Sequence, residues 1–170
     1  MRVINFGSLN VDHVYNVEHF VKPGETIASQ EYQQFVGGKG LNQSIALARA
    51  GATVSHAGSI GADGLMLRDV LIDDGVDVSF VFEVDQPSGH AIIQVDPTGE
   101  NCILLHGGAN QCNAPEMIHS VFDSADPGDM VLLQNEINDL PEIINQAAAK
   151  GLRGRRCTDG GAWQEWQQQQ

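Results

Sequence analysis

Short apolar runs alternate with amphipathic stretches along most of this chain. Val3–Ser8 and Thr53–Gly58 are compact apolar runs, and residues 130–133 are apolar throughout, as expected of a strand that is buried on both faces. Between such runs, for example in residues 140–148, apolar side chains recur along one face at helical spacing. This alternation predicts an α/β fold in which a parallel sheet is flanked by helices.

Two segments depart from this pattern and predict β-hairpins. One spans residues 14–35 around the turn signal Lys22-Pro23-Gly24, and the other spans residues 90–106 around Asp96-Pro97-Thr98-Gly99. Neither hairpin fits a strand–helix–strand crossover. We therefore expect a small β-structure that stands off the sheet and covers a site.

Several helix starts carry polar residues that are typical of N-caps. Asp63 precedes an apolar periodic stretch, and residues 113–116 (Asn-Ala-Pro-Glu) and 139–142 (Asp-Leu-Pro-Glu) each place a glutamate three residues after a capping side chain. The sequence predicts that these three polar side chains cap their helices.

The pattern stops after Gly151. Residues 153–170 show no strand or helix period, contain both tryptophans and end in four glutamines. We expect a division into residues 1–152 and an aberrant, disordered tail of residues 153–170. A shifted reading frame or an expression artefact explains the abrupt change of composition better than a natural tail.

Composition excludes several classes of partner. The chain has 170 residues, 42% of them hydrophobic, and 22 acidic against 9 basic residues give a net charge of −13. This charge argues against nucleic acid and against an anionic membrane surface. Three cysteines without metal-ligand spacing indicate free thiols in a reducing cytoplasm, and no signal peptide or membrane span is apparent.

The candidate binding residues lie where predicted strands end. Gly37-Gly38-Lys39-Gly40 opens a helix, where backbone N–H groups can hold an anionic or hydroxyl-rich ligand. Asn10 and Asp12 follow the first strand, and an amide together with a carboxylate suits a polyol because the two groups supply both donors and acceptors. The sequence predicts a polar small-molecule site at the strand ends.

Over about residues 1–152 the chain resembles the N-terminal half of the ribokinase-like carbohydrate kinases, the PfkB family, and the lysine of its glycine run is similar to the ribokinase type. Six elements occur in the family's order. They are Gly7-Ser8-Leu9-Asn10-Val11-Asp12, Pro23-Gly24-Glu25-Thr26, Gly37-Gly38-Lys39-Gly40 with Asn42-Gln43, Gly58 through Gly64, Gly107-Gly108-Ala109-Asn110, and Leu132-Leu133-Gln134-Asn135-Glu136.

The resemblance implies a sugar kinase that phosphorylates a terminal hydroxyl of ribose with ATP, magnesium and, in some members, potassium. It implies that the hairpins form a lid that also serves as a homodimer contact, with an apolar face that includes Ile92, Val95, Ile103 and Leu105. The sugar-contacting positions that it implies are Asn10, Asp12, Gly37, Gly38, Lys39, Asn42 and Glu136.

The same resemblance places the catalytic base, the anion hole and the ATP and metal sites in a C-terminal half. Its Gly-Ala-Gly-Asp type segment does not occur in this sequence, so we assign no catalytic, cofactor or metal residue. We therefore expect that the chain is truncated and inactive alone. One alternative is a non-catalytic sugar-binding or lid-mediated interaction module. A dehydrogenase-type nucleotide domain is disfavoured because no Gly-x-Gly-x-x-Gly run follows the first strand.

Overall fold

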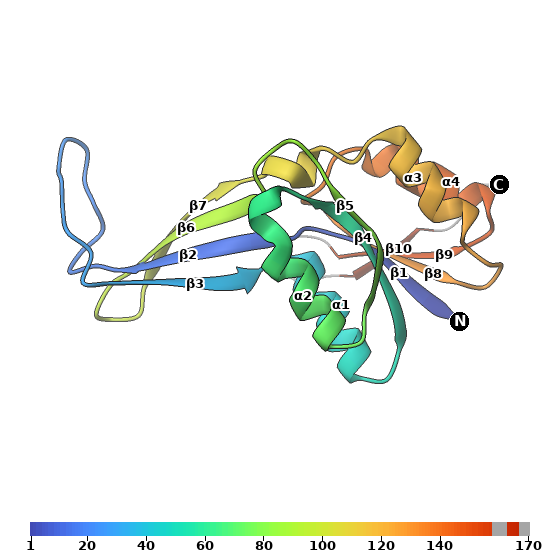
Figure 1. Cartoon of the computed structure of the whole chain (residues 1–170), viewed down its shortest axis with the longest axis horizontal. Helices are drawn as coiled ribbons and strands as arrows, with labels where there is room; N and C mark the ends of the chain where they lie inside the picture. The colour runs from blue at the N-terminus through green and yellow to red at the C-terminus, as the bar shows by residue number, and fades with distance from the viewer. Residues whose placement is uncertain (158–162, 167–170) are drawn as a thin grey trace.

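A computed structural model, which describes residues 1–157 and 163–166, divides the chain into an α/β core and a β-sheet that projects from one end of it (Figure 1). The core sheet has the strand order β10-β9-β8-β1-β4-β5, and all its neighbouring pairs are parallel except β10 with β9. Its strands are β1 (Arg2–Phe6), β4 (Thr53–Ile60), β5 (Asp77–Glu83), β8 (Met130–Gln134), β9 (Arg153–Cys157) and β10 (Trp163–Trp166).

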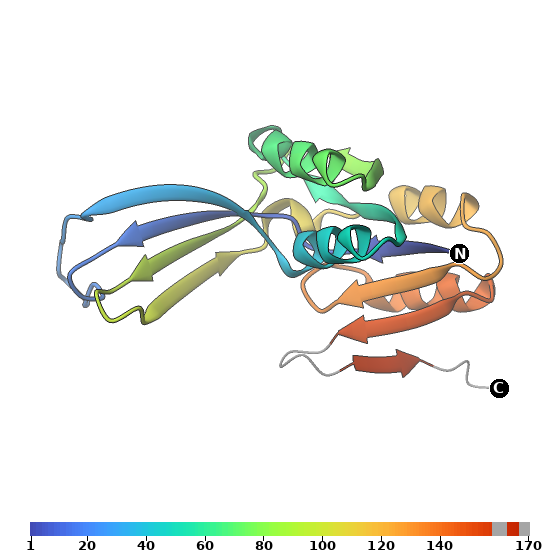
Figure 2. The same cartoon turned by 90° about the horizontal axis from the view of Figure 1, so that it is seen from below.

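Helices cover both faces of this sheet, as Figure 2 shows. On one face α1 (Lys39–Arg49) and α2 (Leu65–Asp73) bury apolar side chains such as Leu41 and Leu67 against β4 and β5. On the other face α3 (Pro115–Asp123) and α4 (Leu140–Ala149) pack on β1 and β8, where the Phe6 and Phe122 rings stack 5.5 Å apart. The predicted fold class is confirmed. In the described part of the chain, no helix has the length and apolar character to cross a membrane.

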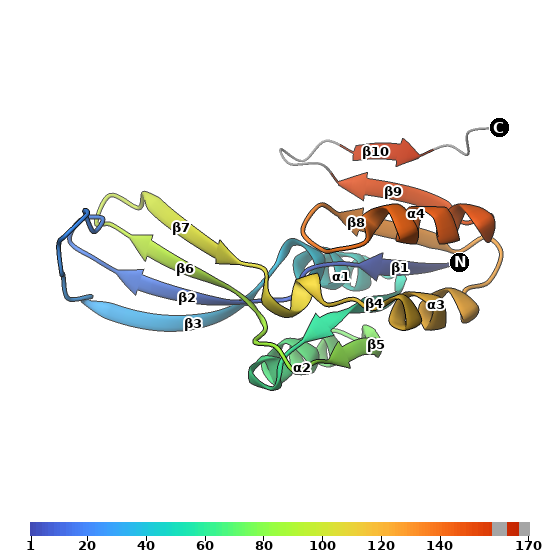
Figure 3. The same ribbon diagram turned by 90° about the horizontal axis from the view of Figure 1, so that it is seen from above.

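The projecting sheet, called the lid here, has four strands in the order β3-β2-β6-β7 (Figure 3). Antiparallel pairing joins β2 to β3 and β6 to β7, so both predicted hairpins form, and parallel pairing of β2 with β6 unites them. The strands are β2 (Asn10–Asn16), β3 (Glu31–Gly37), β6 (Gly89–Val95) and β7 (Asn101–His106).

The register of the lid corrects one expectation about its apolar face. Side chains alternate between the two faces of a strand, so we call the face that carries Asn10 and Asp12 the inner face and the opposite face the outer face. Cross-strand pairing places Val95, Ile103 and Leu105 on the inner face and Ile92 on the outer face. The four side chains expected on one apolar face are thus divided between two.

The predicted caps at three helix starts do not form. Short 3-10 turns (η1, Ala62–Gly64; η2, Gly108–Gln111) lie before α2 and α3, and α2 starts after Gly64 without a side-chain cap. Asp63 instead accepts a hydrogen bond from Ser88 N, 2.9 Å away. Asp139 precedes α4 in a left-handed conformation, and Asn113 lies one residue before the N-cap of α3. The capping prediction was wrong because tertiary hydrogen bonds use Asp63 and Asn113.

The segment after Gly151 includes a strand that its side-chain pattern does not indicate. Residues 153–157 pair with β8 as β9, because parallel pairing needs only backbone groups at an open sheet edge. Leu152 is buried beside α4 in the core. The expected disorder of residues 158–162 and 167–170 lies outside the described residues, and the division of the chain at residue 152 stays a prediction.

Candidate functional site

The candidate site lies where the lid joins the carboxyl ends of the core strands. β1 leads through residues 7–9 into β2, and β3 leads through Gly38 into α1. β8 ends at Gln134, two residues before Glu136. Carboxyl ends of parallel strands share one edge of a sheet, which is where open α/β folds bind ligands. The fold therefore brings together polar residues that are more than 100 positions apart in sequence.

Asn10 and Asp12 lie two residues apart on the inner face of the lid, beside the glycine run. Gly37 pairs with Asn10 across β2 and β3, and the Asp12 carboxylate extends over Gly37 so closely that a Cβ there would overlap it. Burial raises the pKa of Asp12 above its ordinary value, and the neighbouring His13 opposes this rise. Asp12 is thus a half-buried acceptor beside the end of β3.

Glu136 has both carboxylate oxygens engaged. Lys39 Nζ lies 2.7 Å from Oε1, and Ser8 Oγ donates to Oε2 over 2.6 Å. The Lys39 side chain is half exposed, so this ion pair adds little to the stability of the fold. The ion pair instead fixes the position of the start of α1 relative to the loop after β8.

Gly38 makes possible the change of direction between β3 and α1. Its φ of 102° is a conformation that glycine adopts easily, and it serves as the N-cap of α1 without a side-chain cap. A Cβ at this position would also overlap Ser8 O and approach Asn10 N. Backbone from the loop after β1 and from the start of α1 therefore meets at Gly38.

Six of the seven predicted site residues lie in one continuous set of contacts. Asn42 is the exception: it is exposed on α1, and its side chain makes no hydrogen bond with any residue that the structure describes. The neighbouring Gln43 instead accepts a hydrogen bond from Gln134 and so contacts the end of β8. The roles of all seven in binding stay predictions.

A buried polar network beneath the site was not predicted from the sequence. Asn5 Nδ2 donates to both Gly40 O and Ser44 Oγ over 2.8 Å, and Gln134 Nε2 donates to Asn5 Oδ1 over 2.8 Å. The network links β1, α1 and β8 directly under the glycine run. Polar residues within otherwise apolar strands were the signal that could have revealed it.

His56 completes this network from β4. Its Nε2 lies 3.2 Å from Gly7 O and its Nδ1 lies 2.8 Å from Ser44 Oγ. A carbonyl can only accept, so Nε2 carries the proton and Nδ1 accepts from the serine. Complete burial lowers the pKa of His56 to about 4, against which the bond to Gly7 acts in the opposite direction. The imidazole is therefore neutral at physiological pH and supports the segment that leads from β1 into β2.

Asn110 links η2 to the start of the lid. Its Oδ1 accepts from Leu9 N over 2.9 Å, and its Nδ2 donates to Leu9 O over 3.2 Å and to Asn10 Oδ1 over 2.7 Å. Asn110 and Asn10 are both buried. In the sequence, Asn110 stands out only as the last residue of the motif Gly107-Gly108-Ala109-Asn110, which predicts no role for it.

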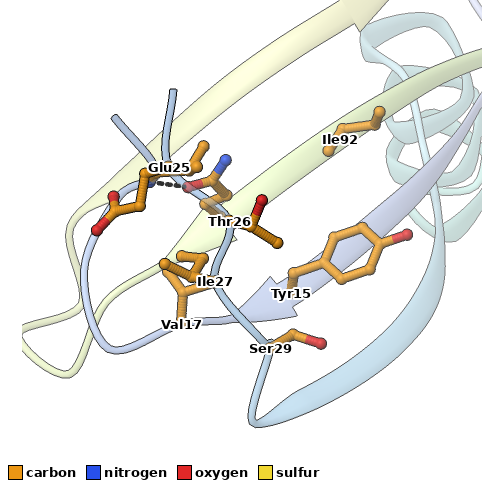
Figure 4. A pocket seen from close by; sticks show the side chains of 9 residues that line it. Tyr15, Val17, Glu25, Thr26, Ile27, Ser29 and Ile92 are labelled. Atoms are coloured by element: carbon orange, nitrogen blue, oxygen red, sulfur yellow. Dashed lines mark hydrogen bonds between the residues drawn. The ribbon is translucent and has the colours of Figure 1, made fainter. Parts of the chain in front are cut away.

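A separate cavity of about 390 Å³ lies at the far end of the lid, under the loop between β2 and β3 (Figure 4). Tyr15, Ile27 and Ile92 are among the side chains that line it. Tyr15 and Ile92 belong to the outer face, so this cavity is separated by the sheet from Asp12. It does not belong to the candidate site.

Comparison with known proteins identifies relatives over nearly the whole chain. Residues 2–153 match the family model described as pfkB family carbohydrate kinase. A ribokinase from Haemophilus influenzae is 39% identical over 133 residues, which are 76% of this chain and 44% of the relative. A ribokinase from Staphylococcus aureus is 37% identical over 150 residues, which are 85% of this chain and 48% of the relative.

Solved structures of ribokinases share the fold. The Cryptococcus neoformans enzyme in complex with ADP has a TM-score of 0.78 and 34% identity, covering 93% of this chain and 49% of its own. The Arabidopsis thaliana enzyme complexed with ribose and ATP has a TM-score of 0.79 and 29% identity. The match covers 94% of this chain and 54% of that enzyme's chain. The chain spans about half the length of the relatives it matches.

Proposed function

The chain belongs to the pfkB family of carbohydrate kinases, and from this premise we propose that it binds ribose at the base of the lid. By family, the bound ribose would be phosphorylated on a terminal hydroxyl with ATP, a step that we do not propose for the 170-residue chain alone. The observation that carries this proposal is the convergence of Asn10, Asp12 and the Lys39–Glu136 pair at the sheet edge. Relatives named ribokinase, one of them solved with ribose and ATP, support ribose as the sugar.

The chemistry of these side chains suits a sugar. A carboxylate accepts hydrogen bonds from hydroxyl groups, whereas an amide both donates and accepts. Lys39 donates to Glu136, and Glu136 also accepts from the Ser8 hydroxyl, so this part of the site is ordered before a ligand enters. An ordered polar site binds more tightly because less conformational freedom is lost on binding.

The proposal for this chain is limited to the sugar. ADP and ATP accompany related ribokinases, and by family we propose nucleotide and magnesium as the other participants. Within residues 1–157 and 163–166, no group of three or more His, Cys, Asp or Glu side chains is placed to hold a metal ion. We assign neither magnesium nor potassium to particular residues of this chain. A cytoplasmic location is likewise proposed from the composition and the family.

We also propose that two copies of the chain pair through the inner faces of their lids. This face carries the apolar side chains Phe35, Ile103 and Leu105, which are about half exposed in the single chain. Sheets bury such faces by packing against each other. A second copy offers a matching apolar face, which makes the lid a candidate dimer contact.

Direct binding measurements test the sugar proposal. We expect the chain to bind ribose in isothermal titration calorimetry and Asp12→Asn to weaken binding by about 2 kcal/mol, because the substitution removes a charged acceptor. Asp69→Asn, on the exposed side of α2, is the matched control and should bind ribose like the unmodified chain. A failure of the unmodified chain to bind any pentose would contradict the proposal.

A further inference from the structure

We infer that Asn110 is a positioning residue that fixes the side-chain amide of Asn10 with its NH₂ group turned toward the sugar. This inference rests on the proposed function for its ligand, but the orientation itself follows from hydrogen bonds within the chain. Asn110 lies in η2, outside the set of residues expected to contact the sugar. It would act through Asn10.

The orientation of Asn110 follows from the backbone of Leu9. A backbone N–H can only donate, so the Asn110 atom that faces Leu9 N is the oxygen Oδ1. A backbone carbonyl can only accept, so the atom that faces Leu9 O is the nitrogen Nδ2. Two independent contacts therefore fix the same orientation of this amide.

The orientation of Asn10 follows in turn. Asn110 Nδ2 can only donate, so the Asn10 atom that lies 2.7 Å from it is the acceptor Oδ1. The NH₂ group of Asn10 consequently points away from Asn110. Asn10 is only 6% exposed, and its NH₂ group makes no hydrogen bond with any other residue in the described part of the chain. Asn10 Nδ2 is not among the buried side-chain atoms that lack a partner in the described residues, so this donor reaches solvent and is open to a ligand atom.

Asn10 and Asp12, side by side on the inner face, together determine which ligand group fits between them. Ionised Asp12 only accepts, and Asn10 held in this way only donates toward the site. A hydroxyl between them can give its proton to Asp12 and receive a hydrogen bond from Asn10. With Asn10 turned over, two acceptors would compete for one proton. The arrangement favours a ligand with a hydroxyl at this point over an analogue that lacks it.

Asn110→Asp tests the inference because it exchanges the NH₂ group for an oxygen at nearly constant shape. The oxygen facing Leu9 N is kept, but the second oxygen needs a donor, and Asn10 can supply one only by turning its own NH₂ group toward residue 110. Asn138→Asp is the matched control. Asn138 holds Asn113 N and Asn113 O through the same pair of bonds, each 2.9 Å long, and makes no hydrogen bond with Asn10 in the described structure.

The first measurement needs no sugar. In the ¹⁵N-labelled chain we expect the side-chain amide protons of Asn110 to exchange slowly with solvent and those of Asn10 to exchange faster. In Asn110→Asp the Asn10 protons should become about tenfold more protected, and in Asn138→Asp they should not change. Slow exchange of the Asn10 protons in the unmodified chain would overturn the inference, even if the variant failed to fold.

The second measurement uses ribose and its monodeoxy analogues in calorimetry. We expect the unmodified chain to bind one analogue about tenfold more weakly than ribose, and Asn110→Asp to lose most of this discrimination. In an Asn10→Ala background, Asn110→Asp should have no further effect on discrimination. If Asn110→Asp reduced this discrimination equally with Asn10 present and with Asn10 replaced by alanine, its effect would be generally structural. That result would overturn the inference. If the unmodified chain binds no ribose, the proposed function fails, and amide exchange alone decides the orientation of Asn10.

Discussion

At the scale of single residues, the candidate site depends on close approaches between side chains and backbone. Asp12 occupies the space that a Cβ on Gly37 would fill, and Gly37 lies within β3 rather than in a turn. The absent side chain at Gly37 thus determines where the Asp12 carboxylate can lie.

Gly37→Ala is expected to weaken ribose binding by about tenfold with little loss of stability. The added methyl group would meet the end of a flexible side chain, so Asp12 can turn aside at small cost, but it then leaves its position facing the site. Calorimetry and thermal unfolding separate the two effects. Gln33→Ala, on the same face and strand of the lid, is the control, and equal ribose affinity in all three proteins would refute this role of Gly37.

His56 gives the fold a predictable dependence on pH. Its pKa is about 4 when folded, below its ordinary value of 6.5, so the unfolded chain takes up a proton first as the pH falls. The corresponding stability is complete above about pH 6.5 and is lost as the pH falls to about 4. The shift corresponds to a loss of about 3 kcal/mol across this window.

Urea unfolding between pH 7 and pH 4 tests this. We expect His56→Gln to be less stable at pH 7 and to lose less stability on acidification than the unmodified chain. His119→Gln, at an exposed position on α3, should keep the full pH dependence. If the free energy of unfolding changed with pH in the same way with and without His56, carboxylates alone would account for the acid sensitivity.

At the scale of elements, the lid has two faces of different character. The inner face carries Asp12 together with apolar side chains. The outer face carries the stacked rings of His13 and Tyr32 and a ring contact between His90 and His106. Consecutive residues on β7 point to opposite faces, so substitutions there can distinguish them.

Ile103→Lys is expected to convert a dimer of the chain to a monomer. Ile103 lies on the inner face and is 55% exposed, so lysine costs little in the single chain but would bury a charge in the proposed contact. Leu104→Lys, on the outer face and 69% exposed, should leave the dimer intact. Light scattering after size-exclusion chromatography measures both. A monomeric unmodified chain, or a dimer that survives Ile103→Lys, would argue against the inner face as the contact.

At the scale of the whole molecule, sugar binding and phosphoryl transfer make different demands. Transfer requires a base, donors for the developing charge and a held nucleotide, and losing one such donor typically costs about two to three orders of magnitude in rate. We expect the 170-residue chain alone, given ribose, Mg–ATP and potassium, to release no ADP in a sugar-dependent manner. Turnover at about 1 to 100 per second would show that its catalytic groups lie among these residues.

The sequence by itself determined the architecture of the core and the two hairpins. Strand–helix alternation requires a parallel sheet with helices on both faces, and Asp96-Pro97-Thr98-Gly99 marks the turn between β6 and β7. It also placed Asn10, Asp12 and Glu136 after strands, so their convergence at one sheet edge follows from parallel topology. These features are local in sequence, which is why they could be predicted.

Only the tertiary structure decided which polar groups meet. Asn110 is 100 residues from Asn10, and Ser8 is 128 residues from Glu136, so no periodicity relates the partners. A long-range bond also explains the failed cap at Asn113, because its Oδ1, the atom that would accept from the helix, accepts from Ser59 Oγ instead. Strand register, set by pairing across the lid, assigned Ile92 and Ile103 to opposite faces. Long-range hydrogen bonds and register depend on the packed fold, whereas the elements themselves depend on the order of residues along the chain.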